Sequence, residues 1–212
     1  VLVRILSSSP HLTQILLRNP EYLYWLTTSD LLRLVRTEDD LQKEANQYAE
    51  LGKQAGLEAL RRFRRRETLR IASQDLLETI DFRSTVQQLS TLARVILQTV
   101  LNLLVPAGNH EGFAVFAFGK LGGSELNYSS DIDLVGVFDA PEGKAAAKGP
   151  DPDALKELYA RVMERVSLDL SSHTEHGYAY RVDLRLRPHG QSGDLVPSFS
   201  GLVDYYRRDA SL

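Results

Sequence analysis

Two aspartates, Asp131 and Asp133, lie one residue apart in the stretch "SSDIDLVGVFD". The apolar run around them predicts a buried strand over 131–139. In a strand, residues i and i+2 point to the same face, with Cα atoms about 6.6 Å apart. Two carboxylates held so close repel each other unless something neutralises them. A hard divalent cation is the usual neutraliser, and magnesium favours carboxylates together with substrate phosphates, so the pair indicates a Mg2+ site.

A third carboxylate is available in the stretch "GYAYRVDLRLRP", which predicts a strand over 177–188. If this strand lies beside the first, Asp183 joins the pair of aspartates. Three carboxylates on adjacent strands can hold two metal ions about 3.5–4 Å apart, an arrangement used for in-line displacement at phosphorus. Arg185 and Arg187 share the face of Asp183 and are predicted to clamp phosphate. The alternative is that they only balance the charge of the aspartates.

The segment before the aspartates, "GKLGGSELNYSS", is rich in glycine, amide and hydroxyl groups. Glycines let the backbone approach a phosphate closely, and the amides of a following helix start favour anions. The residues predicted to cradle phosphate are Gly119, Gly122, Gly123 and Ser124, with a hydroxyl donated by Ser129 or Ser130. The alternative for the whole motif is a solvated or capping pair of aspartates at the exposed start of a strand, because a bare Asp-x-Asp is common.

The elements that must position these side chains follow from the hydrophobic periodicity. Residues 1–105 have apolar residues at helical spacing, and after residue 112 the pattern changes to short apolar runs. Helices are predicted over 38–50, 53–79, 84–104 and 154–173, and strands over 113–119, 131–139 and 177–188. We therefore expect an α+β fold, a small mixed nucleotidyltransferase-like sheet beside a mainly helical N-terminal lobe. The expected division is a helical lobe at 1–107 and an α/β domain at 108–212.

The composition narrows the class of protein. The net charge of −3 argues against a broad basic surface for nucleic acid, so no nucleic-acid partner is expected. The absence of cysteine excludes disulfides, zinc-thiolate sites and cysteine nucleophiles. With no apolar run near the roughly 20 residues of a membrane helix, we expect no membrane partner and a cytoplasmic location. The chain starts at Val1, and we expect it to be a fragment of something longer.

A second basic feature is the run "RRFRRR" at 61–66. Arg62, Arg66 and Arg70 recur every four residues and form one stripe on a helix. Given the acidic net charge, we interpret the stripe as a solvated or interdomain face. The alternative is that Arg70 reaches toward a bound nucleotide or a protein substrate.

Taken together, the motifs resemble a known family. Glycines, a short helix, Asp-x-Asp on a strand and a later third Asp are similar to the pattern of polymerase-β-type nucleotidyltransferases. More narrowly, "GKLGGSELNYSSDIDL" resembles the active-site motif of the glutamine synthetase adenylyltransferase family. The stretches at 182–199 and 60–76 resemble that family's second conserved block and its upstream helical block. The chain departs from the broad superfamily pattern in one respect. Gly122 and Gly123 lie closer in sequence to Asp131 than the superfamily's glycine pair lies to its first aspartate.

The resemblance implies an activity. The family's enzyme has an N-terminal half, which removes AMP from adenylyl-tyrosine of glutamine synthetase by phosphorolysis to give ADP, and a C-terminal half, which adds AMP from ATP. The blocks at 60–76 and 85–101 are more similar to the N-terminal half, so AMP removal is predicted. The implied ligands and partners are Mg2+, ADP or ATP, phosphate, glutamine synthetase and a PII-type signalling protein. The alternatives are the AMP-adding half, another nucleotidyltransferase and a non-catalytic nucleotide-binding module.

Overall fold

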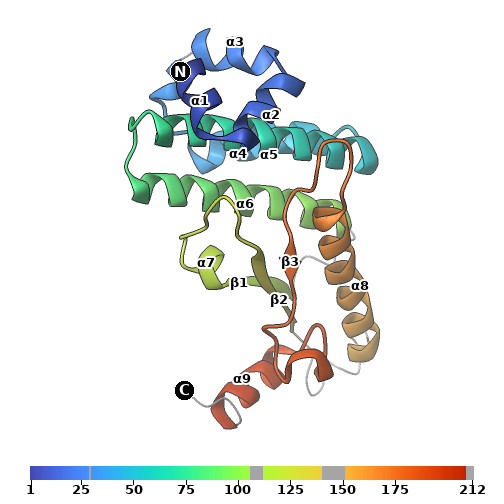
Figure 1. Ribbon diagram of the computed structural model, residues 1–212. Helices are drawn as coiled ribbons and strands as arrows, with labels where there is room; N and C mark the ends of the chain where they lie inside the picture. Colours follow the sequence, from blue (N-terminus) through green and yellow to red (C-terminus); the bar gives the residue numbers. More distant parts are fainter. Residues whose placement is uncertain (29, 106–111, 140–150, 209–212) are drawn as a thin grey trace.

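The computed structural model describes residues 1–28, 30–105, 112–139 and 151–208 (Figure 1). Proline and glycine predict a linker at 106–112 and a loop at 140–153, and most of both segments lies outside these ranges. The described elements, in chain order, are α1 (Leu2–Ser8), α2 (Pro10–Arg18), α3 (Glu21–Thr28), the 3-10 turn η1 (Asp30–Leu32), α4 (Glu38–Ala49), α5 (Lys53–Leu76), α6 (Phe82–Leu104), β1 (Phe113–Phe118), α7 (Gly119–Gly122), β2 (Ile132–Phe138), α8 (Pro152–Ser171), β3 (Val182–Asp183), the 3-10 turn η3 (Gly190–Ser192) and α9 (Phe199–Arg208).

The predicted long helices are confirmed as α4, α5, α6 and α8, each within a few residues of its expected ends. Local chemistry explains their starts. The Thr37 side chain accepts a hydrogen bond from the Asp40 amide at 3.2 Å, and the Asp81 side chain accepts one from the Ser84 amide at 2.7 Å. Each bond satisfies an amide that the first helical turn leaves without a partner. No described helix has both the length and the apolar character needed to cross a membrane.

The sheet is mixed, as predicted. Its strand order is β1-β2-β3, with β1 antiparallel and β3 parallel to β2. The predicted third strand was wrong in length, because only two residues of 177–188 pair as β3. The Asp183 carboxylate accepts a hydrogen bond from the Arg185 amide at 2.8 Å, and this local bond turns the backbone away from the ladder.

Two hydrophobic clusters hold the fold together. The larger joins α4, α5 and α6 to the sheet and α8, so it contains both Ile96 of α6 and Ile132 of β2, each fully buried. The smaller packs α1, α2 and α3 on the opposite side of α5 through residues such as Leu69. Figure 1 shows α5 and α6 running side by side across the molecule, with the small helices on one side and the sheet on the other. The domain boundary near residue 107 stays a prediction, since the larger core contains residues from both sides of it.

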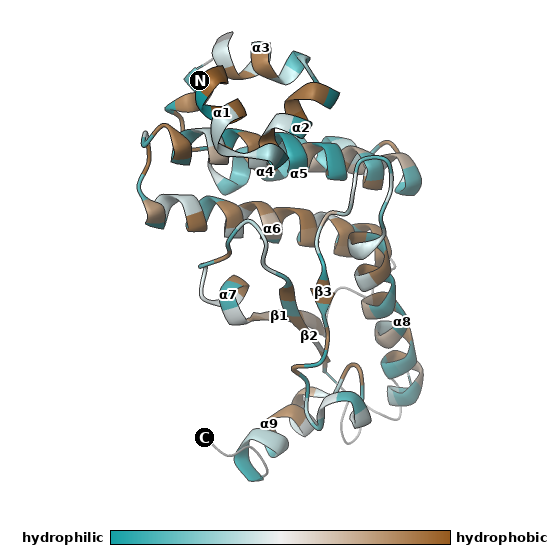
Figure 2. Ribbon diagram, viewed as in Figure 1, coloured by the Kyte–Doolittle hydropathy of each residue, from teal (hydrophilic) through white to brown (hydrophobic). Residues whose placement is uncertain are grey.

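The arginine stripe on α5 corrects an expectation from the sequence. Arg62 is exposed, but Arg70 is fully buried and the Arg66 guanidinium lies 4.8 Å from the centre of the Trp25 ring. A solvated face was therefore wrong for Arg66 and Arg70, because α3, the segment after η1 and α4 cover that side of α5. Figure 2 shows hydrophilic residues along α5 although it lies between two layers of helices. Arg70 is held by the buried carboxylate of Glu67 at 2.8 Å, so it does not reach toward the sheet.

Candidate active site

The strand register brings the predicted aspartates together. Asp133 on β2 is the direct neighbour of Asp183 on β3, which confirms that the two strands adjoin. Across the other edge of β2, Asp133 pairs with Phe118, the last residue of β1. Asp131 precedes Asp133 by two residues, at the entrance to the same strand. The three carboxylates therefore come from one end of the sheet, beside the turn that follows β1.

The turn after β1 depends on glycine at two positions. Gly119 has a φ of +55°, and a Cβ atom there would lie 2.5 Å from the Oδ2 atom of Asp133. A Cβ atom on Gly122 would lie 2.5 Å from the carbonyl oxygen of Ala117. Both contacts are closer than real Cβ atoms tolerate. The glycines thus allow α7 to start directly against the carboxylate of Asp133, with the backbone rather than a side chain facing it.

Replacing Gly119 with alanine tests this close approach, and Gly190 provides a matched control. Gly190 has a φ of +57° but nothing within 4 Å of an added Cβ. Gly190→Ala should therefore lower the free energy of unfolding only by the left-handed backbone cost of about 1–2 kcal/mol. Gly119→Ala should lose at least about 1 kcal/mol more, because the Asp133 carboxylate must also shift. Urea unfolding of both variants measures the difference, and equal losses would contradict the proposed contact.

Two arginines engage the outer aspartates. Arg181 donates from Nε to the Asp131 carboxylate and from Nη2 to the carbonyl oxygen of Ser129, the latter at 3.0 Å. Arg185 donates from Nε to both oxygens of Asp183 at 3.0 and 2.9 Å. This ion pair is the one expected if Arg185 balances the charge of the aspartates. Arg181 was not among the residues predicted from the sequence, although it precedes Asp183 by two residues on an alternating segment.

The other residues predicted to bind phosphate make contacts outside the three aspartates. Arg187 donates to the carbonyl oxygens of Leu184 and Gly193, so the structure does not bring it to the aspartates. Ser130 donates its hydroxyl to the Asn127 side chain at 2.7 Å. The hydroxyl of Ser124 accepts a bond of 3.4 Å from Arg94. Exposed Gly123 and Ser129 complete the loop that links α7 to β2.

The electrostatics reflect the crowding of like charges. Burial, followed by the charges of Asp183 and Asp131, raises the pKa of the Asp133 carboxyl above its ordinary value. In contrast, the hydrogen bonds from Arg185 lower the pKa of Asp183. Asp133 is therefore the carboxylate in this group that lacks an arginine partner of its own among the described residues, and it stands to gain most from a bound cation.

The fit of a metal ion can be judged from these donors. Three carboxylates on one end of the sheet are hard oxygen donors of the kind that Mg2+ prefers. In the described part of the chain, however, no three His, Asp or Glu side chains converge as a group that would hold a metal ion. The reason is that Asp131 and Asp183 are turned onto Arg181 and Arg185. The three aspartates are therefore suitable ligands for Mg2+, but Asp131 and Asp183 must first break their ion pairs with Arg181 and Arg185.

A small mixed sheet with clustered aspartates beside a glycine turn, joined to a helical lobe, defines a nucleotidyltransferase-like α+β protein. The family model described as Glutamate-ammonia ligase adenylyltransferase matches residues 1–211, and the chain belongs to this family.

The relatives carry one shared name, "Bifunctional glutamine synthetase adenylyltransferase/adenylyl-removing enzyme". The protein of this name from Shewanella oneidensis is 34% identical over 215 residues, covering 96% of this chain. Those from Shewanella frigidimarina and Methylococcus capsulatus are 34% and 33% identical, covering 97% and 99%. The chain spans only 22–24% of the length of these relatives.

Proposed function

We propose that this chain carries the site that removes AMP from adenylyl-tyrosine of glutamine synthetase by phosphorolysis, releasing ADP. The observation that carries the proposal is the pairing of Asp133 with Asp183 on adjacent parallel strands, next to the close approach of Gly119. Membership of the Glutamate-ammonia ligase adenylyltransferase family supports this chemistry. The names of the relatives include both adenylyltransferase and adenylyl-removing activities.

The bond changes of the proposed reaction are simple. An oxygen of inorganic phosphate forms a bond to the phosphorus of the AMP group, and the bond from that phosphorus to the tyrosine oxygen breaks. The products are ADP and a free tyrosine, whose oxygen takes up a proton. Because the attacking phosphate is already anionic, no strong general base is needed. The phenol of tyrosine has a pKa of about 10, so the leaving oxygen needs stabilisation as it departs.

Different residues would bind the phosphate groups and neutralise the charge on them. The backbone of the turn at 119–124 would face the phosphate groups, because glycine leaves its amides accessible. Magnesium, held by Asp131, Asp133 and Asp183, would supply neutralisation of the charge that builds on the phosphorus oxygens. Arg185 has a side chain that is 69% exposed, so it can turn from Asp183 onto a phosphate group, where its planar guanidinium suits two-point binding.

The direction of AMP transfer is tested with purified glutamine synthetase in both states. Adenylylated glutamine synthetase is incubated with the chain, phosphate and Mg2+, and ADP is measured by chromatography. The expected result is ADP formation that requires phosphate and stops when EDTA removes the metal. A parallel reaction offers unmodified glutamine synthetase and ATP. AMP incorporation there, without ADP formation in the first reaction, would overturn removal in favour of addition, and inactivity in both reactions would favour a binding module.

A further inference from the structure

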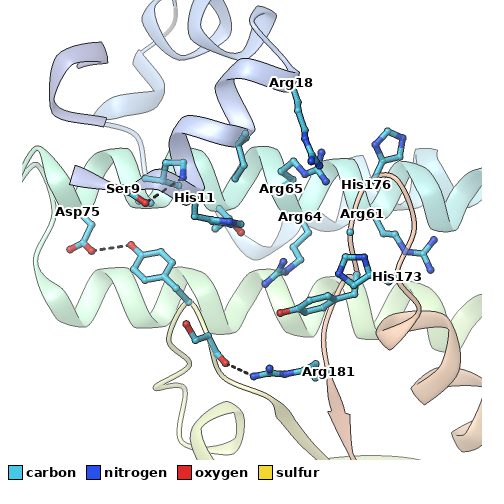
Figure 3. A pocket seen from close by; sticks show the side chains of 18 of the residues that line it. Ser9, His11, Arg18, Arg61, Arg64, Arg65, Asp75, His173, His176 and Arg181 are labelled. Atoms are coloured by element: carbon cyan, nitrogen blue, oxygen red, sulfur yellow. Dashed lines mark hydrogen bonds between the residues drawn. The ribbon is translucent and has the colours of Figure 1, made fainter. Parts of the chain in front are cut away.

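A second candidate site lies on the other side of Arg181 from the aspartates. A cavity of about 620 Å³ is enclosed by α2, α5, the loop at 128–129 and the segment 173–181 (Figure 3). Its volume falls within the range of roughly 300–1,000 Å³ that is typical of small-molecule sites. The hydroxyl of Tyr128 donates to Asp75 at 2.9 Å across one side of it. The cavity is thus formed where the helical N-terminal part meets the loops around the sheet.

The walls of this cavity are strongly cationic. Among the described lining residues there are five arginines and one carboxylate, namely Arg18, Arg61, Arg64, Arg65, Arg181 and Asp75. Three histidines add further nitrogen donors, and all three are labelled in Figure 3. The carboxylate accepts the Tyr128 hydroxyl and forms no ion pair with these arginines among the described residues, so the lining keeps an excess of positive charge.

Three of the arginines have no acidic partner. Arg61 pairs with Glu58 and Arg181 with Asp131. For Arg18, Arg64 and Arg65, by contrast, no ion pair is found in the part of the chain that the structure describes. Figure 3 shows Arg18 of α2 and Arg65 of α5 pointing toward one another. Like charges in a partly buried position repel, so this arrangement is costly unless an anion joins it.

The electrostatic consequences appear on two neighbouring groups. Arg65 is partly buried, and burial, with Arg18 and Arg64 adding to it, lowers the pKa of its guanidinium. Burial, Arg64 and Arg65 also lower the pKa of the His11 imidazole, which projects into the cavity from α2. A negative charge in the cavity would reverse both effects, because it stabilises the protonated forms.

Arg64 is held in position by aromatic rings rather than by a carboxylate. Its guanidinium carbon lies 4.7 Å from the ring centre of Tyr180 and 5.7 Å from that of Tyr178. Such stacking fixes the plane of a guanidinium while leaving its edge available for hydrogen bonds. The Nε atom of Arg64 is buried and has no hydrogen-bond partner among the described residues. The same holds for the Nε atoms of Arg61 and Arg66 and the Nη2 atom of Arg70, so the unpaired donor of Arg64 counts here only because Arg64 also lines the cavity.

We propose that this cavity binds a phosphate group, held by Arg64 and Arg65 of α5 and Arg18 of α2. Guanidinium groups suit phosphate because their planar donors match its oxygens in pairs. The site is separate from the proposed phosphate turn at 119–124. The proposal does not depend on the direction, or on the existence, of AMP transfer. The phosphate group belongs either to inorganic phosphate or to a nucleotide, since the cavity volume admits both.

The cavity and the aspartate cluster share one residue, Arg181. Ser129 and Arg181 line the cavity, and Arg181 also donates to the carboxylate of Asp131. An anion that drew Arg181 into the cavity would free Asp131. The two sites would therefore be linked through one exposed side chain, 57% of which is accessible.

Nuclear magnetic resonance of the histidine side chains tests binding directly. The chain is titrated in EDTA, so that metal-dependent binding at the aspartates does not contribute, with inorganic phosphate, ADP or ATP in separate arms. The signals of His11 are assigned from a His11→Gln variant. Phosphate binding is expected to give a saturable change and to raise the pKa of His11, whereas sodium chloride at equal ionic strength should not.

Matched variants separate a binding role from a general charge effect. Arg65→Gln should weaken binding at least tenfold and should leave the melting temperature unchanged or higher, because an unpaired cation is removed. Arg83→Gln, exposed on α6 and outside the cavity lining, should leave the affinity unchanged. Asp133→Asn should also retain binding, which distinguishes this site from the proposed catalytic one.

The outcomes are distinct. A response to inorganic phosphate, to the nucleotides or to both supports the proposal and identifies the source of the phosphate group. The absence of a saturable change with all three ligands would overturn it. Equal responses in Arg65→Gln and the unsubstituted chain, or equal responses to chloride, would overturn it as well.

Discussion

Asp133→Asn is expected to lower the rate of AMP removal about a thousandfold. The substitution keeps the shape of the side chain but removes the one carboxylate of the cluster that lacks an arginine partner among the described residues. A metal ion typically contributes several kcal/mol of charge stabilisation at phosphorus. Each 1.36 kcal/mol corresponds to a tenfold change in rate. The rate is measured as ADP release from adenylylated glutamine synthetase at saturating phosphate.

The same variant should not lose stability, which separates a catalytic role from a structural one. In metal-free protein, burial and two carboxylates raise the folded-state pKa of Asp133 above its unfolded value. Its favourable contribution is therefore present below the unfolded pKa and is lost as pH rises through the folded pKa. Asparagine avoids that loss, so unfolding in EDTA at neutral pH should show equal or greater stability. Marked destabilisation together with the loss of activity would contradict this interpretation.

The matched control for activity is Asp204→Asn on α9. Asp204 is exposed, and its Oδ1 atom lies 4.0 Å from the Nη2 atom of Arg208 on the same helix. Neither residue belongs to the strand ends that carry the three aspartates. Exposed pairs of this kind contribute little, so the variant should retain the rate and the stability of the unsubstituted chain. A similar loss of rate in both variants would mean that the effect reflects net charge rather than a specific site.

Glu67→Gln is expected to cost about 3–5 kcal/mol of the free energy of unfolding, because it removes one partner of a buried charge network. Glu67 is fully buried and accepts from Arg36 at 2.7 Å, Arg66 at 3.2 Å and Arg70 at 2.8 Å. The amide leaves these cations with less negative charge around them. Chemical denaturation followed by circular dichroism measures the loss.

Glu157→Gln serves as the control for this prediction. Glu157 pairs with Arg161 at 3.5 Å, and both side chains are largely exposed. The expected change is within about 0.5 kcal/mol, because solvent screens such a pair. A double variant that combines Glu67→Gln with Arg70→Met should recover part of the lost stability, since it removes a cation that the first change leaves poorly compensated. Equal effects of the two glutamate substitutions would contradict a structural role for the buried network.

The buried network around Glu67 and the cavity use different faces of α5. The network around Glu67 fixes α4 and α5 to each other through Glu44, which accepts from Arg36 and Arg66. The same helix α5 then presents Arg64 and Arg65 to the cavity on another face. Arginines of a single run, "RRFRRR" and its continuation, thus act either as buried structural cations or as available anion ligands. Their roles differ because different elements pack against each face of the helix.

Much of the candidate site followed from local sequence patterns. The alternation around Asp131 and Asp133 predicted a strand with both carboxylates on one face, and the apolar neighbour Ile132 is indeed fully buried. The glycines before them predicted a close backbone approach to phosphate, which stays a prediction; in the structure Gly119 closely approaches the Asp133 carboxylate. The strand and its two faces depend on side-chain spacing within a few residues, and the sequence gives that spacing directly. That the strand of Asp183 adjoins this one was only a condition for the site, and the pairing of β2 with β3 meets it.

The length of β3 and the partners of the charged side chains did not follow from the sequence. The alternation over 177–188 suggested a long strand, but the bond from the Arg185 amide to Asp183 ends the pairing after two residues. Nor could helical spacing tell that Arg70 would be buried, because its burial depends on the segment after η1 folding back over α5, where the Leu34 carbonyl accepts from Arg70.

The sequence by itself thus determined the chemistry available to this protein: clustered carboxylates, flexible glycines and an arginine-rich helix in an α+β fold. The tertiary structure decided which of these groups meet. It paired Arg181 with Asp131, buried Arg70 against Glu67 and left Arg65 at the cavity with no ion pair among the described residues. The physical reason is that an ion pair forms between surfaces far apart in the chain, and its partners are fixed only when the helices and the sheet have packed.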